Sequence, residues 1–319
     1  MLFRSNLFGT YRQFLFSLDS SIVASELFKS EASIQLRDPQ LFSVRTLAGQ
    51  IRGFALYEET PTYDLFDRGV GIMLEKKLTE ELSVQFGYHL LWSQILELKG
   101  DMEQEEEKGT TFFATLQEKI ILNFRDSNAY PTSGSYHFIE LEESLTALAA
   151  EIDYFKIYGH TAWYFRIVGR CVLSVALRGG VIAPFGKSDR IPIQKRFFSG
   201  GVDSVRSFKT KEIPPLNDQD KPTGGEGLFL LSTELRIPIY GNFGISLFGD
   251  SGQIIPVVRR FKDYRISHMK YAVGVSLWYN TPIGPLRFDM GINPDREENP
   301  LTGTKEELFA WFISIGFSY

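Results

Sequence analysis

The sequence predicts an all-β protein, an antiparallel up-and-down transmembrane β-barrel with about fourteen strands. Three observations predict this fold class. Nearly every segment alternates apolar and polar residues with a period of two, as strands with two different faces do. The expected strands cluster near about ten residues, the length a tilted strand needs to cross a bilayer. Short turns alternate with longer polar links, as in membrane barrels.

The composition is compatible with this fold and argues against other classes. The 319 residues include 27 Phe and 14 Tyr, and the net charge is −5, which argues against a disordered chain and a nucleic-acid-binding protein. The apolar runs are shorter than the roughly 18 residues of a membrane helix. The single cysteine, Cys171, cannot form an internal disulfide or a cysteine metal site.

The whole chain, residues 1–319, is expected to form one barrel domain. The expected strands are residues 11–19, 32–37, 43–56, 69–76, 82–93, 110–125, 135–143, 154–167, 171–182, 228–237, 243–254, 269–279, 285–293 and 308–319. The links expected to be long are residues 20–31, 57–68, 94–109, 187–227 and 294–307. Long links on one side and short turns on the other favour a membrane barrel over a soluble sandwich.

The direction of side chains in the C-terminal strands gives the barrel two different faces. In residues 285–293, four large apolar residues alternate with a set that includes Arg287 and Asp289. Charges on one face suit a polar lumen, whereas they would be costly in a sandwich core. In the last strand one face carries Trp311, Ile313, Ile315, Phe317 and Tyr319.

The link 187–227 is the stretch around which we expect the chain to be organised. Its centre, residues 199–208, reads Ser-Gly-Gly-Val-Asp-Ser-Val-Arg-Ser-Phe. A loop of this length in a compact domain is usually functional or disordered. Arg206 lies between the apolar Val205 and Phe208, an arrangement for which a solvated loop has little use. We therefore expect the loop to fold back into the lumen and dock there through Arg206.

Two acidic residues on the following strands are the expected partners of this arginine. Strand parity places Glu234 and Asp250 on the lumen face. A guanidinium offers five donors in a rigid fork that carboxylates can bind in pairs. Pairing of Arg206 with both acids would pin the loop inside the barrel. The alternative is that all three are lumen charges solvated independently.

These residues carry a resemblance to a known family. The segment Val205, Arg206, Ser207 and Phe208 resembles the loop-six motif of the BamA/TamA superfamily of outer-membrane assembly barrels, whose core reads Val-Arg-Gly-Phe/Tyr. Residues 282–289, Pro-Ile-Gly-Pro-Leu-Arg-Phe-Asp, and the turn-like segments at 6–10 and 130–134 are similar in the same order. The resemblance implies that the arginine contacts two inner-wall acids, which Glu234 and Asp250 match.

The chain departs from the family pattern in two places. Ser207 stands where the motif has Gly, and a serine restricts the backbone more. The family barrel has sixteen strands, and its Asn-Leu-Phe-Gly turn follows the second of them. This sequence carries that turn at residues 6–9. The resemblance therefore implies that the first two strands, and the periplasmic POTRA repeats before them, are missing.

The resemblance implies a non-enzymatic, integral outer-membrane protein that assembles, inserts or translocates other outer-membrane proteins. It implies that client strands are templated at a weak barrel seam. The implied partners are the lipid bilayer, unfolded client proteins and accessory periplasmic or POTRA-bearing components, with no nucleic acid, cofactor or metal. The residues implied in the C-terminal strand signal and seam are Trp311, Ile313, Ile315, Gly316, Phe317 and Tyr319.

Other function classes stay open at this point. One is a passive pore or a dedicated secretion channel for one partner protein, and another is a soluble β-barrel binding protein. An enzyme is not expected, because the four histidines, His89, His137, His160 and His268, show no metal-ligand spacing and no pairing with a Ser-Asp arrangement.

Overall fold

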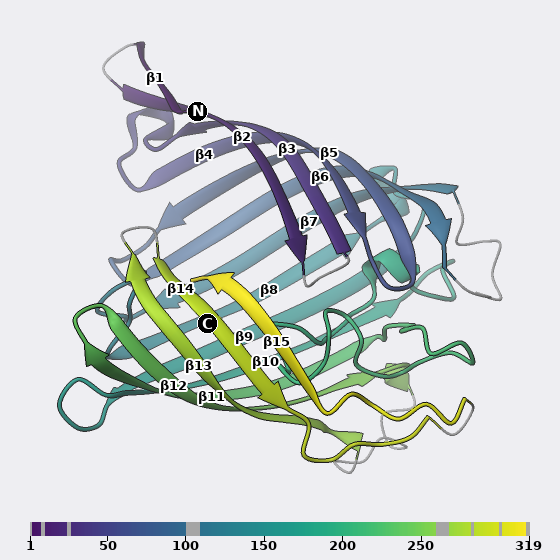
Figure 1. The fold of residues 1–319 in the computed structure, drawn as a ribbon. Coiled ribbons are helices and arrows are strands. Elements are labelled where there is room, and N and C mark those ends of the chain that lie inside the picture. Colours follow the sequence, from purple (N-terminus) through teal and green to yellow (C-terminus); the bar gives the residue numbers. More distant parts are fainter. Residues whose placement is uncertain are drawn as a thin grey trace. The chain divides into compact units, whose positions relative to one another are not determined.

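The computed structural model describes residues 2–7, 10–23, 27–99, 109–259, 268–281, 284–299 and 302–316, and side chains from residue 28 onward. Fifteen strands form one sheet in which each strand pairs with its neighbour in the sequence (Figure 1). The predicted fold class, all-β with antiparallel up-and-down strands, is confirmed. Across these ranges, no helix is both long and apolar enough to span a membrane.

The strands follow one another along the whole chain. They are β1 Leu2–Leu7, β2 Thr10–Val23, β3 Leu27–Asp38, β4 Leu47–Glu59, β5 Tyr63–Lys77, β6 Leu82–Leu98, β7 Gly109–Asn123, β8 Gly134–Ser144, β9 Tyr154–Arg166, β10 Val172–Pro184, β11 Gly227–Tyr240, β12 Phe243–Ile255, β13 Lys270–Thr281, β14 Gly284–Ile292 and β15 Phe309–Ile315. The 3-10 turns are η2 Leu41–Ser43, η4 Thr146–Leu148 and η5 Ile193–Lys195.

The chain forms two compact units. Unit 1 comprises Met1–Leu122, Phe138–Ile157 and Ile182–Lys195, and unit 2 comprises Asn123–His137, Tyr158–Val181 and Arg196–Tyr319. Unit 1 therefore contains β1 to β6, and unit 2 contains β11 to β15. The long loop between β10 and β11 contributes its first part to unit 1 and its second part to unit 2.

The N-terminal third differs in detail from the expected strands. β1 precedes the turn at which the first expected strand begins, so the described residues form fifteen strands where the sequence predicts about fourteen. The links expected at 20–31 and 57–68 are mostly strand. Glu58 and Glu59 still pair with Leu65 and Asp64, because backbone pairing does not depend on whether the side chains are polar.

A threonine closes the hairpin between β4 and β5. The hydroxyl of Thr60 donates to the carbonyl of Tyr63 at 2.6 Å and accepts from the Tyr63 N–H at 2.9 Å. Such local side-chain bonds replace backbone partners in tight turns. The regular alternation of long and short links therefore fails at this hairpin.

The strands of unit 2 have one apolar face and one charged face, as expected. On β14, Leu286, Phe288, Met290 and Ile292 are exposed, whereas Arg287 and Asp289 are buried. β15 continues the same alternation. We call these sides the apolar face and the charged face. The core of unit 2 lies on the charged face, where the second part of the long loop packs.

Candidate functional site

The loop segment 199–208 is buried against the charged face of unit 2. Val205, Arg206, Ser207 and Phe208 are all buried. The segment turns back on itself, because the N–H of Gly201 donates to the carbonyl of Phe208 at 2.9 Å. Gly200 has a φ of +108°, and a Cβ there would lie 2.3 Å from the carbonyl oxygen of Lys209. Only glycine fits this position without strain.

Arg206 binds both acids that strand parity assigned to the inner wall. Its Nε lies 2.8 Å from Asp250 Oδ2 and its Nη2 lies 2.9 Å from Asp250 Oδ1, so this carboxylate is held by two parallel bonds. Its Nη1 donates to Glu234 Oε2 at 3.1 Å. The guanidinium also lies 3.5 Å from the ring centre of Phe248. The side chains of Arg206, Glu234 and Asp250 are each about 1% exposed.

Two residues of β14 complete this ionic cluster, and the sequence reasoning did not include them in the site. Arg287 Nη2 donates to Glu234 Oε2 at 3.0 Å and to Asp289 Oδ1 at 2.7 Å. Asp289 Oδ1 also lies 3.7 Å from Arg206 Nη1. Two guanidinium groups thus face three carboxylates. Parity had placed Arg287 and Asp289 on this face, and that was the signal that could have found them.

The charged face of β14 allows the loop backbone to approach closely. A Cβ on Gly291 of β14 would lie 2.0 Å from the carbonyl oxygen of Arg206. The neighbouring Ser207 donates its hydroxyl to the carbonyl of Tyr271 at 2.7 Å. Ser207 does not have a positive φ, which explains why a serine can occupy the position where the family motif has glycine.

Exposed residues of the loop also bind the link between β14 and β15. Lys209 Nζ lies 2.7 Å from Glu307 Oε1. The carboxylate of Asp220 accepts hydrogen bonds from Asn299, Thr302 and Thr304. The bonds from the two threonines lower the pKa of Asp220. The second part of the loop is thus bound both at the charged face and at the link that leads into β15.

In unit 1, a different cation binds the first part of the same loop, and the sequence reasoning missed it. Lys195 Nζ lies 3.3 Å from Glu142 Oε1 on β8 and 4.7 Å from the ring centre of Phe113. The hydroxyl of Tyr154 also donates to Glu142. Lys195 lies in the long loop, whose path the local sequence pattern does not indicate.

The residues predicted for the C-terminal strand do not join the ionic cluster. Trp311, Ile313 and Ile315 lie on the apolar face of β15 and are exposed. Gly316 has a φ of +104°, and its N–H donates to the carbonyl of Pro285 at 2.8 Å. Phe317 and Tyr319 lie outside the described residues. In the described part of the chain, no group of His, Cys, Asp or Glu could hold a metal ion.

The chain is similar to proteins of one family over nearly its whole length. The sequence model of the Omp85 superfamily domain matches residues 6–317. The outer membrane protein assembly factor BamA of Neorickettsia risticii is 22% identical over 298 residues, which cover 90% of this chain and 39% of that protein. BamA of Nitratidesulfovibrio vulgaris is 24% identical over 221 residues, covering 68% of this chain and 28% of that protein. The sorting and assembly machinery component 50 homolog A of Xenopus laevis is 27% identical over 146 residues, covering 46% and 30%.

Solved structures agree with the fold. BamA from Haemophilus ducreyi lacking POTRA domains 1–3 superposes with a TM-score of 0.76 at 16% identity, covering 95% of this chain and 64% of that one. CdiB from Acinetobacter baumannii gives a TM-score of 0.55 at 13% identity, covering 97% and 54%. This chain spans between 28% and 39% of the length of the two BamA sequences. It belongs to the Omp85 superfamily and is an integral protein of the outer membrane.

Proposed function

We propose that this chain forms the membrane barrel of a machine that assembles and inserts other outer-membrane proteins without a covalent step. The observation that carries the proposal is the likeness of 90% of the chain to a protein named an outer membrane protein assembly factor. Matches to sorting and assembly machinery components support the same class of function. The Arg206 cluster and the C-terminal strand are the parts to which we assign roles.

The C-terminal strand β15 is the place where client strands would be templated. β15 is the last strand of the sheet order and pairs with β14 over the seven residues Phe309–Ile315. A strand edge presents backbone N–H and C=O groups to which an incoming strand can add by β-augmentation. Trp311, Ile313 and Ile315 would hold this edge at lipid depth through their exposed apolar side chains.

The docked loop would keep the wall beside this strand in place. Arg206 is bonded to Glu234 on β11 and Asp250 on β12, and Arg287 connects the cluster to β14. β14 is the strand against which β15 pairs. The cluster joins β11, β12 and β14 and includes no residue of β15, so β15 would be free to exchange partners, as a templating seam requires.

Reconstitution tests this proposal directly. The protein, in the full length in which its host makes it, is placed in liposomes and supplied with urea-unfolded outer-membrane barrels. Folded clients are measured by their shifted mobility on unheated gels. Folding should be faster than in liposomes containing an unrelated passive barrel of similar size, and Arg206→Ala should slow it. Equal rates with the passive barrel would contradict an assembly function.

Depletion in cells separates assembly from the alternative of a channel for one partner. An assembly factor should cause a general loss of folded barrels from the outer membrane when it is depleted. A dedicated secretion channel should cause the loss of one secreted protein while other barrels persist. Quantitative proteomics of the outer-membrane fraction and of the medium measures both outcomes in one experiment.

A further inference from the structure

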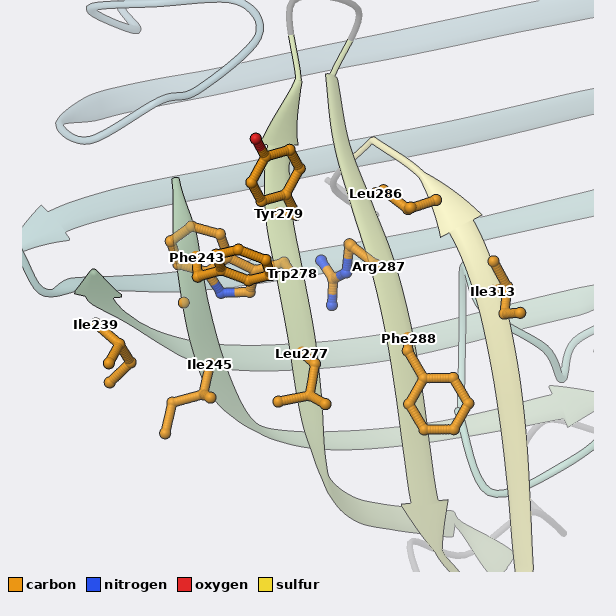
Figure 2. Close-up of a pocket in the computed structure, with 11 residues that line it drawn as sticks. Ile239, Phe243, Ile245, Leu277, Trp278, Tyr279, Leu286, Arg287, Phe288 and Ile313 are labelled. Carbon is orange, nitrogen blue, oxygen red and sulfur yellow. The ribbon is translucent and has the colours of Figure 1, made fainter. Parts of the chain in front are cut away.

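Two cavities of unit 2 have different surroundings. One is an apolar groove of about 430 Å³, and Figure 2 shows side chains of neighbouring strands along it, among them Leu277, Phe288 and Ile313. These side chains belong to the apolar face, which contacts lipid in an outer-membrane protein. The other cavity, of about 450 Å³, lies between the second part of the long loop and the link between β14 and β15. We call it the outer cavity, and none of the roles proposed above uses it.

The two walls of the outer cavity are held in shape by backbone hydrogen bonds. The loop contributes an apolar wall made of Phe208, Pro214, Pro215 and Leu216. Behind this wall, the N–H of Thr223 donates to the carbonyl of Pro215 at 2.9 Å. In the link, the N–H of Gly303 donates to the carbonyl of Asn299 at 2.8 Å. A ligand would therefore meet walls that are already formed, which lowers the cost of ordering them on binding.

Acidic residues outnumber basic residues around this cavity. Two lysines, Lys209 and Lys305, line it together with six acidic residues: Glu212, Asp220, Glu297, Glu298, Glu306 and Glu307. A third lysine, the buried Lys270 of β13, lies 2.6 Å from Glu297 and 2.5 Å from Glu306. Three lysines thus face six carboxylates, so the cavity keeps an excess of negative charge.

Three of these carboxylates remain open to a positively charged ligand. Glu298 is exposed and forms no ion pair with a described residue. Asp220 accepts hydrogen bonds from neutral donors, which leave its charge uncompensated. Glu307 pairs with Lys209, but the two side chains are 57% and 48% exposed. Water screens such a pair, so a cation of the ligand can replace Lys209 there.

We propose that the outer cavity binds a segment of an extracellular protein that presents an arginine or lysine beside an apolar side chain. The charged head would bind carboxylates of the lining such as Glu298 and Glu307, and an arginine would do so through its fork. The apolar side chain and the stem of the cation would pack on Phe208 and Leu216. Long loops lie on the extracellular side of outer-membrane barrels, so the partner comes from outside. The site goes beyond the assembly function and does not depend on it.

Peptide binding to the full-length protein in phosphatidylcholine nanodiscs tests the proposal. The probes are two peptides with a neutral fluorophore, Gly-Leu-Arg-Leu-Gly and the same peptide with Gln in place of Arg. Fluorescence anisotropy measures their dissociation constants. The arginine peptide should bind about tenfold more tightly than the glutamine peptide.

Variants of the cavity lining locate the binding site. The double variant Glu298→Gln with Glu307→Gln should remove the preference for the arginine peptide, and Leu216→Ala should weaken binding of both peptides. Glu298 and Glu307 are exposed, so the double variant should fold. The matched control is Asp218→Asn with Asp295→Asn, which changes one exposed acid of the loop and one of the link that do not line the cavity.

The competing outcomes each overturn the proposal. They are equal affinity for both peptides, equal affinity in the double variant and its control, and no binding of the arginine peptide at about 1 mM. If about 0.5 M salt abolishes binding and Leu216→Ala leaves it unchanged, the peptide only follows the negative charge of the surface. If replacing Arg260, Lys262 and Arg265 by Gln tightens binding about tenfold, the occupant is this chain's own link after β12. The assay contains no client, so failure here leaves the assembly function standing.

Discussion

The long loop is held by one cation in each unit, and the two contacts differ in kind. In unit 1, Lys195 reaches Glu142 at 3.3 Å, with the two side chains 15% and 18% exposed. In unit 2, Arg206 contacts Asp250 and Glu234, and all three side chains are about 1% exposed. Both contacts join a loop cation to a carboxylate on a strand, but the second is buried more completely.

The difference shows how geometry and burial together decide what such a contact does. Lysine presents a compact charge that one carboxylate satisfies, and an ion pair that water partly reaches is screened more than a fully buried one. The arginine fork satisfies two carboxylates at once. When the ions are buried, loss of one partner leaves the others without compensation in a medium of low dielectric constant. The arginine contact should therefore contribute more to the stability of the docked loop than the lysine contact does.

Arg206→Ala should have the largest effect, because it removes both bonds that hold the buried Asp250 carboxylate and leaves Glu234 with Arg287 alone. We expect it to lower the free energy of unfolding by about 3–5 kcal/mol, and by less if water enters. Protease cuts should appear between residues 187 and 227 in detergent micelles. The matched Lys195→Ala should cost less, because its single bond to Glu142 is more open to water. Equal protection of the loop in both variants would remove the distinction between the two contacts.

Gly291→Ala should give the next largest effect. It tests the position of the loop backbone without removing any charge. The new Cβ would lie 2.0 Å from the carbonyl oxygen of Arg206, so the loop or β14 must move. Overpacking of this kind typically costs about 1–3 kcal/mol. Gly249→Ala on β12 is the control, since the closest atom to its Cβ would be 3.4 Å away. Thermal unfolding should be earlier for Gly291→Ala alone, and an unshifted curve would mean that the loop is not seated here.

Arg206→Lys should lower the free energy of unfolding by less than either substitution above, because it keeps the positive charge and removes only the forked guanidinium. One ammonium cannot replace the two parallel bonds to Asp250 and the bond to Glu234. We expect a loss of roughly 1–3 kcal/mol, whereas the reverse exchange in unit 1, Lys195→Arg, should be nearly neutral. Denaturant unfolding of the two variants measures this. If both exchanges were neutral, the fork would not matter.

Much of the fold and part of the site could be read from the sequence, because both depend on a local period of two. Parity placed Glu234 and Asp250 on the inner wall, and the apolar neighbours of Arg206 indicated that it is buried. What the sequence could not indicate depends on pairing between distant segments. Arg287 and Asp289 join the cluster through the cross-strand register, and Glu142 meets Lys195 through the path of the loop.

The errors in the N-terminal third have a related cause. β1 is a six-residue strand whose Arg, Ser and Asn dilute the apolar period, and the hairpin of β4 and β5 continues through Glu58 and Glu59. A prediction that considers only side-chain polarity assigns such polar residues to loops. Backbone pairing extended these strands regardless of side-chain polarity.

The smallest expected effect concerns the carboxylate of Asp126, which is held by hydrogen bonds from neutral donors. It tests whether such bonds can fix a turn of unit 2 without an arginine. Burial would raise the pKa of Asp126, but hydrogen bonds from Thr132 and Ser133 outweigh it and lower the pKa from 3.8 to about 2. A lowered pKa means that the turn between β7 and β8 is stabilised above pH 3.8 and loses this contribution as the pH falls toward 2. The amide signal of Thr132, followed by NMR in micelles, should titrate near the lower value. Asp126→Asn should abolish that titration, and because the donors are neutral, added salt should leave its midpoint almost unchanged. A midpoint near the ordinary value would show that these bonds do not hold the turn, and that unit 2 relies on its arginines alone.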